Sequence, residues 1–216
     1  MNTYIDHTLL KPNATSEDIK QLCAEAIENN FYAVCIHGSF VKLAKSFLEN
    51  SEVKVCSVIG FPLGAMATEA KRFESQQAIQ DGVDEVDMVI NLGWAKSGKF
   101  KEIEEEIALI KRSIGNKILK VILEICYLTS EEIKLATHAA LNANADFVKT
   151  STGFGTGGAT LEAVAEMKEV AQNDIQIKAS GGIRDFLTAK SYIDLGVTRI
   201  GTSSGISILK GENSSL

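Results

Sequence analysis

Two lysines stand where the chain turns from apolar to polar, and both are candidates for amine chemistry. The stretch "DFVKTSTGFGTGGAT" (146–160) contains Lys149 at the end of an apolar run, and "QIKASGGIR" (176–184) contains Lys178 in the same setting. A lysine nucleophile must be neutral, and the ordinary lysine pKa of about 10.4 leaves few molecules neutral near pH 7. Two ammonium groups held close together repel each other, so one of them loses its proton more readily. The pair therefore favours Schiff-base catalysis, in which one lysine attacks a carbonyl carbon and its neighbour keeps it unprotonated.

Short β-branched runs alternate along the chain with amphipathic stretches, which is the pattern of a parallel sheet with helical crossovers. Eight such units in a chain of 216 residues predict an α/β fold, a closed (β/α)₈ TIM barrel that forms one domain over residues 1–216. An open doubly wound sheet remains the alternative because the first strand is weak. The predicted strands are 4–8, 33–37, 53–60, 84–91, 118–126, 146–150, 175–180 and 198–202.

Helix signals fall between these strands. Ser16 and Thr129 precede amphipathic segments and are typical helix caps, and apolar residues share one face of the segment 100–113. Gly82 and Gly196 stand where a helix would stop.

Ionisable residues are expected inside the barrel. Side chains alternate along a strand, and in most of the predicted strands the set that faces the helices is apolar, which directs the polar set toward the barrel axis. Lysine is rarely buried without a partner, so this convergence indicates either a site or internal salt bridges that stabilise the barrel. Both interpretations stay open for Lys120 and Glu124, whereas Lys149 and Lys178 precede turns of the kind where barrel enzymes place their chemistry. The residues expected to face the axis include Asp6, Cys35, Glu85, Asp87, Lys120, Glu124, Lys149 and Lys178.

Several motifs resemble one family. "VCIH", "VDMVIN", "FVKTSTGF", "KASGGIR" and "GTSSG" follow one another in the order and spacing of the deoxyribose-phosphate aldolases, and "IDHTLLKP" resembles their N-terminus. The resemblance covers essentially the whole chain. It implies a class I aldolase on a TIM barrel that cleaves 2-deoxyribose 5-phosphate reversibly to glyceraldehyde 3-phosphate and acetaldehyde, with no metal and no organic cofactor. It also implies a homo-oligomer, a dimer or larger.

The resemblance assigns roles to individual residues. Lys149 is similar to the Schiff-base lysine, Lys178 to the lysine that keeps it deprotonated, and Asp87 to the acid or base that transfers protons. Phe154 stands where some members have a basic residue, and the tail ending in Leu216 lacks the tyrosine found in others. Asp6 and Cys35 match pocket residues, Gly181, Gly182, Ser203 and Ser204 match phosphate-binding turns, and Lys120 and Thr150 complete the predicted substrate-binding set.

Three further hypotheses compete with this assignment, and the first is a dinucleotide site. Gly153, Gly155 and Gly158 spell G-x-G-x-x-G, and Asp174 lies about where a ribose-binding acid would stand. That motif falls in the sixth β/α unit and leaves both lysines unexplained, and on its own it is weak evidence. The second hypothesis is a transaldolase-like enzyme acting on another sugar phosphate, and the third is a barrel that binds a sugar phosphate without catalysis.

Net charge and hydropathy argue against a nucleic acid or a membrane as the partner of this protein, which leaves small molecules. A net charge of −6 disfavours a nucleic-acid surface. No apolar stretch approaches the length of a membrane span, and the N-terminus lacks a signal-peptide core, so we expect a cytoplasmic protein. The four cysteines form no C-x-x-C pair and the three histidines have no ligand spacing, which argues against a metal site. The expected partners are a sugar phosphate and aldehydes.

Overall fold

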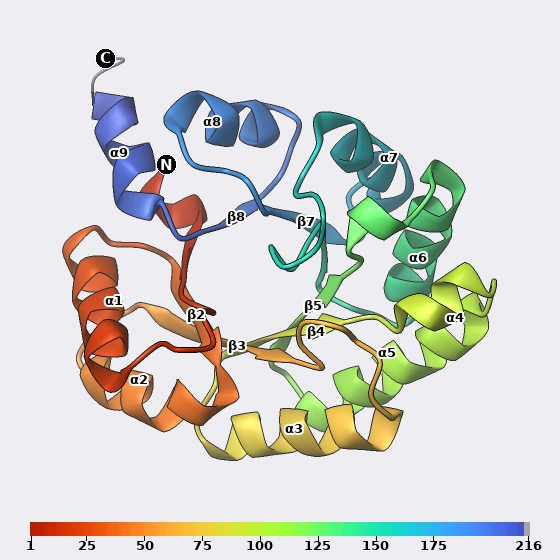
Figure 1. Cartoon of the computed structure of the whole chain (residues 1–216), viewed down its shortest axis with the longest axis horizontal. Coiled ribbons are helices and arrows are strands. Elements are labelled where there is room, and N and C mark those ends of the chain that lie inside the picture. The colour runs from red at the N-terminus through yellow and green to blue at the C-terminus, as the bar shows by residue number, and fades with distance from the viewer. Residues whose placement is uncertain (214–216) are drawn as a thin grey trace.

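The chain folds into a closed barrel of eight parallel strands surrounded by helices, as a computed structural model that describes residues 1–213 shows (Figure 1). The strands pair in chain order around the barrel. This confirms the predicted TIM barrel. The strands are β1 (Ile5–Thr8), β2 (Ala33–His37), β3 (Lys54–Ile59), β4 (Glu85–Val89), β5 (Ile118–Ile122), β6 (Phe147–Lys149), β7 (Gln176–Ser180) and β8 (Arg199–Thr202).

The first strand closes the barrel. Asp6 of β1 lies in register with Ala33 of β2 on one side and with Gly201 of β8 on the other. The segment 4–8, which is weak as an isolated strand pattern, is therefore hydrogen-bonded along both edges. Its conformation depends on its two neighbours, and the open-sheet alternative is wrong.

Helices form a ring around the strands (Figure 1). Thr15 and Thr129 begin α1 and α6 with reciprocal capping boxes, so the first cap is Thr15 and the predicted cap Ser16 is already helical. Gly82 and Gly196 follow α3 and α8 with positive φ, as expected for residues that end a helix. The helices are α1 (Ser16–Glu28), α2 (Val41–Phe47), α3 (Thr68–Gln80), α4 (Leu92–Lys96), α5 (Phe100–Ile114), α6 (Ser130–Asn142), α7 (Leu161–Ala171), α8 (Phe186–Asp194) and α9 (Gly205–Asn213), with short 3-10 turns η1 (Asn2–Tyr4), η2 (Gly38–Phe40) and η3 (Ile125–Tyr127).

Strand β5 ends earlier than its apolar sequence suggests. The run 118–126 predicts one long strand, but β5 stops at Ile122 and Glu124 adopts a left-handed backbone with φ 55°. Turn η3 follows directly. The β-branched residues of this run are as compatible with a buried turn as with a longer strand, and periodicity alone does not distinguish a turn from a strand here.

Most of the hydrophobic core lies between the strands and the helices. Each strand contributes at least one β-branched residue that points outward from the barrel toward the helices and is at most 2% exposed. Burial of such a side chain stabilises the fold by about 1.5–3 kcal/mol. A smaller cluster of Leu10, Cys35, Cys56 and Val58 packs separately. The outward residues are Ile5, Val34, Val55, Val86, Val121, Val148, Ile177 and Ile200.

The two ends of the described chain meet. The amino group of Met1 lies 3.6 Å from Oε1 of Glu212 in α9, and Figure 1 shows the N-terminus beside this helix. Residues 214–216, including the Leu216 end of the tail, lie outside the described residues. Within residues 1–213, no helix combines the length and apolarity needed to cross a membrane.

A buried ion pair joins α3 to α5. Lys71 Nζ donates to Oε2 of Glu106 at 2.7 Å and to the carbonyl of Val89 at 2.9 Å, and neither charged side chain is more than 1% exposed. Burial lowers the pKa of Lys71, although the Glu106 carboxylate opposes this shift. The pair therefore holds the end of β4 against two helices.

We predict that Glu106→Ala destabilises the fold by about 3–5 kcal/mol, because it leaves the Lys71 ammonium buried without its carboxylate. Urea unfolding at pH 7 measures the loss. The double variant Lys71→Met with Glu106→Leu removes both charges and should recover most of the stability. A loss below about 1 kcal/mol for Glu106→Ala, the value of an exposed pair, would contradict the prediction.

Candidate active site

Three lysines share one carboxylate inside the barrel. Oδ2 of Asp87 accepts hydrogen bonds from Nζ of Lys149 at 2.8 Å and from Nζ of Lys178 at 2.9 Å, while Oδ1 accepts from Nζ of Lys120 at 2.7 Å. All four side chains are at most 3% exposed. Strand register brings these side chains together. Asp87 of β4 is the register partner of Lys120 in β5, and Lys149 of β6 is the register partner of Lys178 in β7.

A second layer of charges lies beneath these lysines. Lys178 Nζ also donates to Asp6, whose other oxygen accepts from Arg199 Nη1 at 2.7 Å. Arg199 contacts Glu85 at 3.2 Å, and Glu85 lies 2.7 Å from Nζ of Lys120. The Arg199 guanidinium also stacks 3.4 Å above the Tyr32 ring. We call Asp6, Glu85, Asp87, Lys120, Lys149, Lys178 and Arg199 the ionic cluster.

Arg199 is the member of this cluster that sequence reasoning missed. It is the first residue of the short strand β8, and Ile200 beside it faces the helices. Because side chains alternate along a strand, Arg199 in "TRIGT" is expected to face the barrel axis, so the sequence already indicated that it joins the other charged residues inside the barrel.

The ionic cluster contains four positive groups and three carboxylates, which leaves one positive charge in excess. Burial alone would raise the pKa of Asp87, but the ammonium groups of Lys120, Lys149 and Lys178 hold it well below 3.8. Burial likewise opposes the charge on Lys178, and Asp6 and Asp87 outweigh it and raise the pKa of Lys178. Both aspartates are therefore ionised in the folded protein near neutral pH.

A cavity of about 320 Å³ opens above the cluster at the carboxyl ends of the strands. Lys149 lines it, whereas Lys120 and Lys178 are fully buried and are not among its lining residues. Gly181, Gly182 and Ser203, three predicted phosphate-binding residues, also line it.

Two further basic residues of the lining were not predicted from the sequence. They are Lys11 after β1 and Arg184 after β7. The sequence feature that could have pointed to them is a basic residue in a turn that directly follows a barrel strand.

Five predicted substrate-binding residues lie outside the cavity lining, namely Asp6, Cys35, Lys120, Thr150 and Ser204. The Thr150 hydroxyl donates to the carbonyl of Ser180 at 2.9 Å and accepts from the Ser180 N–H at 3.0 Å, which ties β6 to β7. Ser204 immediately precedes α9, and its N–H donates to the Thr202 hydroxyl at 2.9 Å. Their substrate-binding roles stay predictions.

The glycines after Lys149 are explained by packing in the loop between β6 and α7. A Cβ on Gly155 would lie 2.8 Å from Sγ of Cys126, and a Cβ on Gly158 would lie 2.3 Å from the carbonyl oxygen of Gly181. Gly153 has φ 86°, which a side chain disfavours. These contacts account for the G-x-G-x-x-G pattern without a nucleotide.

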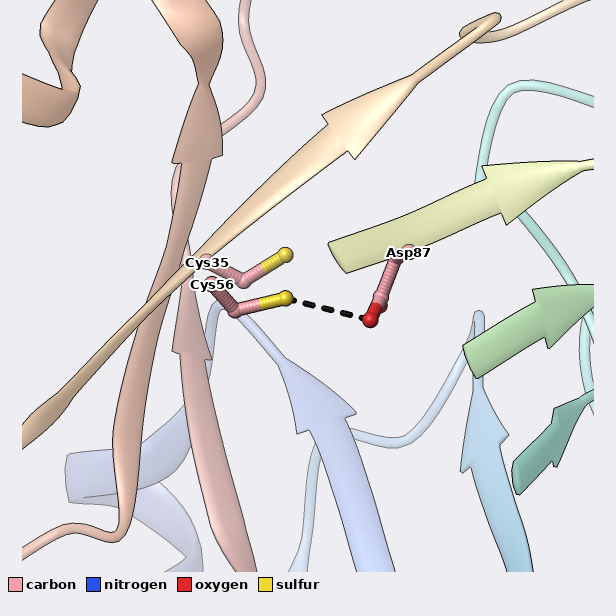
Figure 2. A group of neighbouring side chains, drawn as sticks. All are labelled: Cys35, Cys56 and Asp87. Carbon is pink, nitrogen blue, oxygen red and sulfur yellow. Dashed lines mark hydrogen bonds between the residues drawn. The ribbon is translucent and has the colours of Figure 1, made fainter. Parts of the chain in front are cut away.

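Two thiols lie beside Asp87 in the barrel (Figure 2). The Sγ of Cys56 donates to Oδ1 of Asp87 at 3.1 Å, and Cys35 lies beside Cys56 because the two are register partners in β2 and β3. Their ligand atoms fall within 4.8 Å of one another, close enough to hold a metal ion. However, both Asp87 oxygens already accept from ammonium groups, and the excess positive charge opposes a further cation. Burial also raises the pKa of Cys56, so this thiol stays neutral. The role of Cys35 stays a prediction.

Comparisons with known proteins place the chain in a family. A family model described as DeoC/LacD family aldolase matches residues 1–210. The chain belongs to the DeoC/LacD aldolase family.

Relatives of this aldolase are similar over their full length. A deoxyribose-phosphate aldolase of Coprothermobacter proteolyticus is 54% identical over 209 residues, which cover 97% of this chain and 95% of that protein. One from Streptococcus gordonii is 52% identical over 215 residues, which cover 100% of this chain and 98% of that protein.

Solved structures agree. "QR15, an Aldolase" matches with a TM-score of 0.94 and 46% identity, covering 99% of this chain and 96% of that chain. The deoxyribose phosphate aldolase of Aeropyrum pernix, described as tetrameric, matches with a TM-score of 0.89 and 34% identity, covering 100% of this chain and 92% of that chain.

We predict that Asp6 makes the stability of the aldolase pH-dependent. Burial would raise the pKa of Asp6, but Lys178, Arg199 and Lys120 outweigh it and lower the pKa to about 2. Because the folded pKa lies below the unfolded value, the stabilisation is present above about pH 4 and is lost as the pH falls toward 2. The contribution is on the order of 2 kcal/mol.

Unfolding of the wild type and of Asp6→Asn at several pH values measures this term. The stability difference between them should be largest near neutral pH and should shrink between pH 4 and the folded pKa of about 2. A difference that stays constant over this range would show that Asp6 stabilises the fold by something other than its charge.

Proposed function

We propose that this aldolase is a deoxyribose-phosphate aldolase, which cleaves 2-deoxyribose 5-phosphate reversibly to glyceraldehyde 3-phosphate and acetaldehyde through a Schiff base on Lys149. The observation that supports this most directly is that Lys149 lines the cavity while its amine contacts Asp87 and, through it, a buried cluster with excess positive charge. Relatives about half identical over their full length are deoxyribose-phosphate aldolases.

The proposed mechanism needs Lys149 as a neutral nucleophile, and the charge count of the ionic cluster is compatible with one neutral amine. Loss of one proton from Lys149 removes the excess positive charge and leaves three cations opposite three carboxylates. Lys149 is the lysine of the cluster that reaches the cavity, so it is the one that a carbonyl substrate meets. Asp87 Oδ2 lies 2.8 Å from Lys149 Nζ and 2.9 Å from Lys178 Nζ, a geometry in which this oxygen can pass a proton between the two amines.

The reaction then follows from Schiff-base chemistry. Neutral Lys149 attacks C1 of the open-chain sugar, and water leaves to form an iminium ion. The hydroxyl on C3 loses its proton as the C2–C3 bond breaks, and the electron pair of that bond moves toward the iminium nitrogen to form an enamine. C3 becomes the aldehyde carbon of glyceraldehyde 3-phosphate, which departs. Protonation of the enamine carbon near Asp87 and Lys178, followed by hydrolysis, releases acetaldehyde.

The phosphate of the substrate fits the turns after β7 and β8. Gly181, Gly182 and Ser203 present backbone and hydroxyl groups to the cavity, and α9 begins directly after this turn. Barrel enzymes commonly bind phosphate at this place, beside the start of a helix. Arg184 and Lys11 add positive charge to the same cavity.

The state of assembly is a separate proposal. We expect a homo-oligomer, in line with the tetrameric description of the Aeropyrum pernix relative. Large apolar side chains exposed on the described surface, including Leu63, Phe73 and Leu187, are available to such an interface.

We predict that acetaldehyde and borohydride together leave one ethyl group on Lys149, because the iminium is reduced where it forms. Intact mass and a peptide map locate the adduct. Lys149→Ala should abolish it and lower cleavage of 2-deoxyribose 5-phosphate about a thousandfold or more. Lys190→Ala, which removes an exposed lysine paired with Asp194, is the matched control and should behave as wild type.

Adducts scattered over surface lysines, or near-normal turnover by Lys149→Ala, would refute the mechanism. Cleavage of a ketose donor in place of the deoxy sugar would indicate a transaldolase-like enzyme. Binding of sugar phosphate without turnover would indicate a non-catalytic binder.

A further inference from the structure

Glu124 is a buried carboxylate held by neutral donors. Its side chain is 2% exposed, and none of the ion pairs found in residues 1–213 includes it. It accepts hydrogen bonds from the hydroxyl of Thr152 and from the Thr152 N–H, at 3.3 Å to each carboxylate oxygen. The salt-bridge interpretation that the sequence left open for Glu124 is therefore wrong.

The backbone of Glu124 is unusual as well. Its φ of 55° and ψ of 63° lie in the left-handed region, which is costly for a residue with a Cβ. The surrounding contacts stabilise this conformation, and it places the carboxylate against the loop between β6 and α7. Gly155 of that loop packs so closely that a Cβ on it would lie 3.1 Å from Cδ of Glu124.

The contact extends from Glu124 into the cavity wall. Thr152, the residue that Glu124 holds, also accepts a hydrogen bond through its hydroxyl from the N–H of Phe154 at 3.0 Å. Thr152, Gly153 and Phe154 all line the cavity. One carboxylate thus orders three consecutive residues of the wall that faces a bound substrate.

The nucleophile is held independently of this carboxylate. The Lys149 carbonyl accepts from the Leu123 N–H at 2.9 Å, and the Thr150 N–H donates to the Lys178 carbonyl at 3.1 Å. Neither backbone bond uses the Glu124 side chain, and the Lys149 amine is bonded to Asp87. Loss of the Glu124 carboxylate therefore disturbs the wall of the cavity while the nucleophile stays in place.

We propose that Glu124 is a positioning residue for the sugar-phosphate substrate, acting through Thr152 on the loop 152–154. This role rests on the proposed aldolase function. We expect loss of this role to weaken binding of the sugar phosphate, which also contacts the cavity wall, and to leave the reaction with acetaldehyde unchanged, because acetaldehyde is small enough to need only Lys149. The hydrogen bonds to Thr152 depend on how far the acceptor oxygens of residue 124 reach, since the donors in the loop are neutral.

The test compares Glu124→Asp with Glu124→Gln. Asp keeps the charge and tolerates a left-handed backbone but is one methylene shorter, and Gln keeps the reach of an acceptor oxygen without the charge. For Glu124→Asp we expect the KM for 2-deoxyribose 5-phosphate to rise about tenfold with kcat nearly unchanged, and the rate of borohydride trapping of acetaldehyde on Lys149 to stay at the wild-type value. Glu124→Gln should recover most of the lost binding.

Glu74→Asp is the matched control. Oε2 of Glu74 accepts from the Gly60 N–H at 2.7 Å after β3, so this change shortens a similar carboxylate-to-loop contact at a loop that does not line the cavity. It should leave KM unchanged. Thermal unfolding of each variant checks that the fold is retained.

Three outcomes would overturn the role of Glu124: a wild-type KM in Glu124→Asp, an equal fall in cleavage and in acetaldehyde trapping, or a Glu124→Gln variant as impaired as Glu124→Asp. The last would show that the negative charge of Glu124 is needed as well, which contradicts a role that depends on the reach of its acceptor oxygens alone. Absence of cleavage by the wild-type protein would instead refute the proposed function itself, and trapping on Lys149 separates the two cases.

Discussion

The carboxylate of Asp87 is the contact on which the interior of this barrel depends. Three ammonium groups donate to its two oxygens, and without it Lys120, Lys149 and Lys178 would lie together in a space that is almost closed to water. Like charges in such a place are strongly unfavourable, so the carboxylate makes the assembly of the three lysines possible. One positive charge is still left over in the ionic cluster, so the carboxylate balances most of the lysine charge but not all of it.

Barrel closure is what brings these groups together. Asp6 and Arg199 stand 193 residues apart in the chain, yet they form a direct hydrogen bond because β1 and β8 are neighbours. The bond between Asp6 and Lys178 depends on the same closure. The weak strand at the start of the chain is therefore part of both the fold and the charge balance of the site.

The loop after β6 serves the cavity in a different way. Its glycines permit close contact with Cys126 and Gly181, and Glu124 supplies the hydrogen-bond acceptors that order its first residues. The dinucleotide motif in this loop thus reflects tight packing at Gly155 and Gly158 and the positive φ of Gly153. A glycine pattern reports where backbone comes close to another atom, and the neighbouring residues determine whether that atom belongs to a ligand or to the protein.

Local sequence determined the alternation of strands and helices, the inward direction of the polar residues, and the two lysines in β6 and β7. These features follow from periods of two and of 3.6 residues and from turn residues, all of which are written in short segments. Helix caps such as Thr129 and the stops at Gly82 and Gly196 were readable for the same reason.

Tertiary structure alone decided which charges meet. The sequence did not reveal that Arg199 pairs with Asp6 and Glu85, that Lys11 and Arg184 share the cavity with Lys149, or that Glu124 holds Thr152 and pairs with no cation among the described residues. It also did not reveal the end of β5 at Ile122. Each of these depends on strand register and on contacts between segments far apart in the chain, and a pattern within one segment contains no information about either.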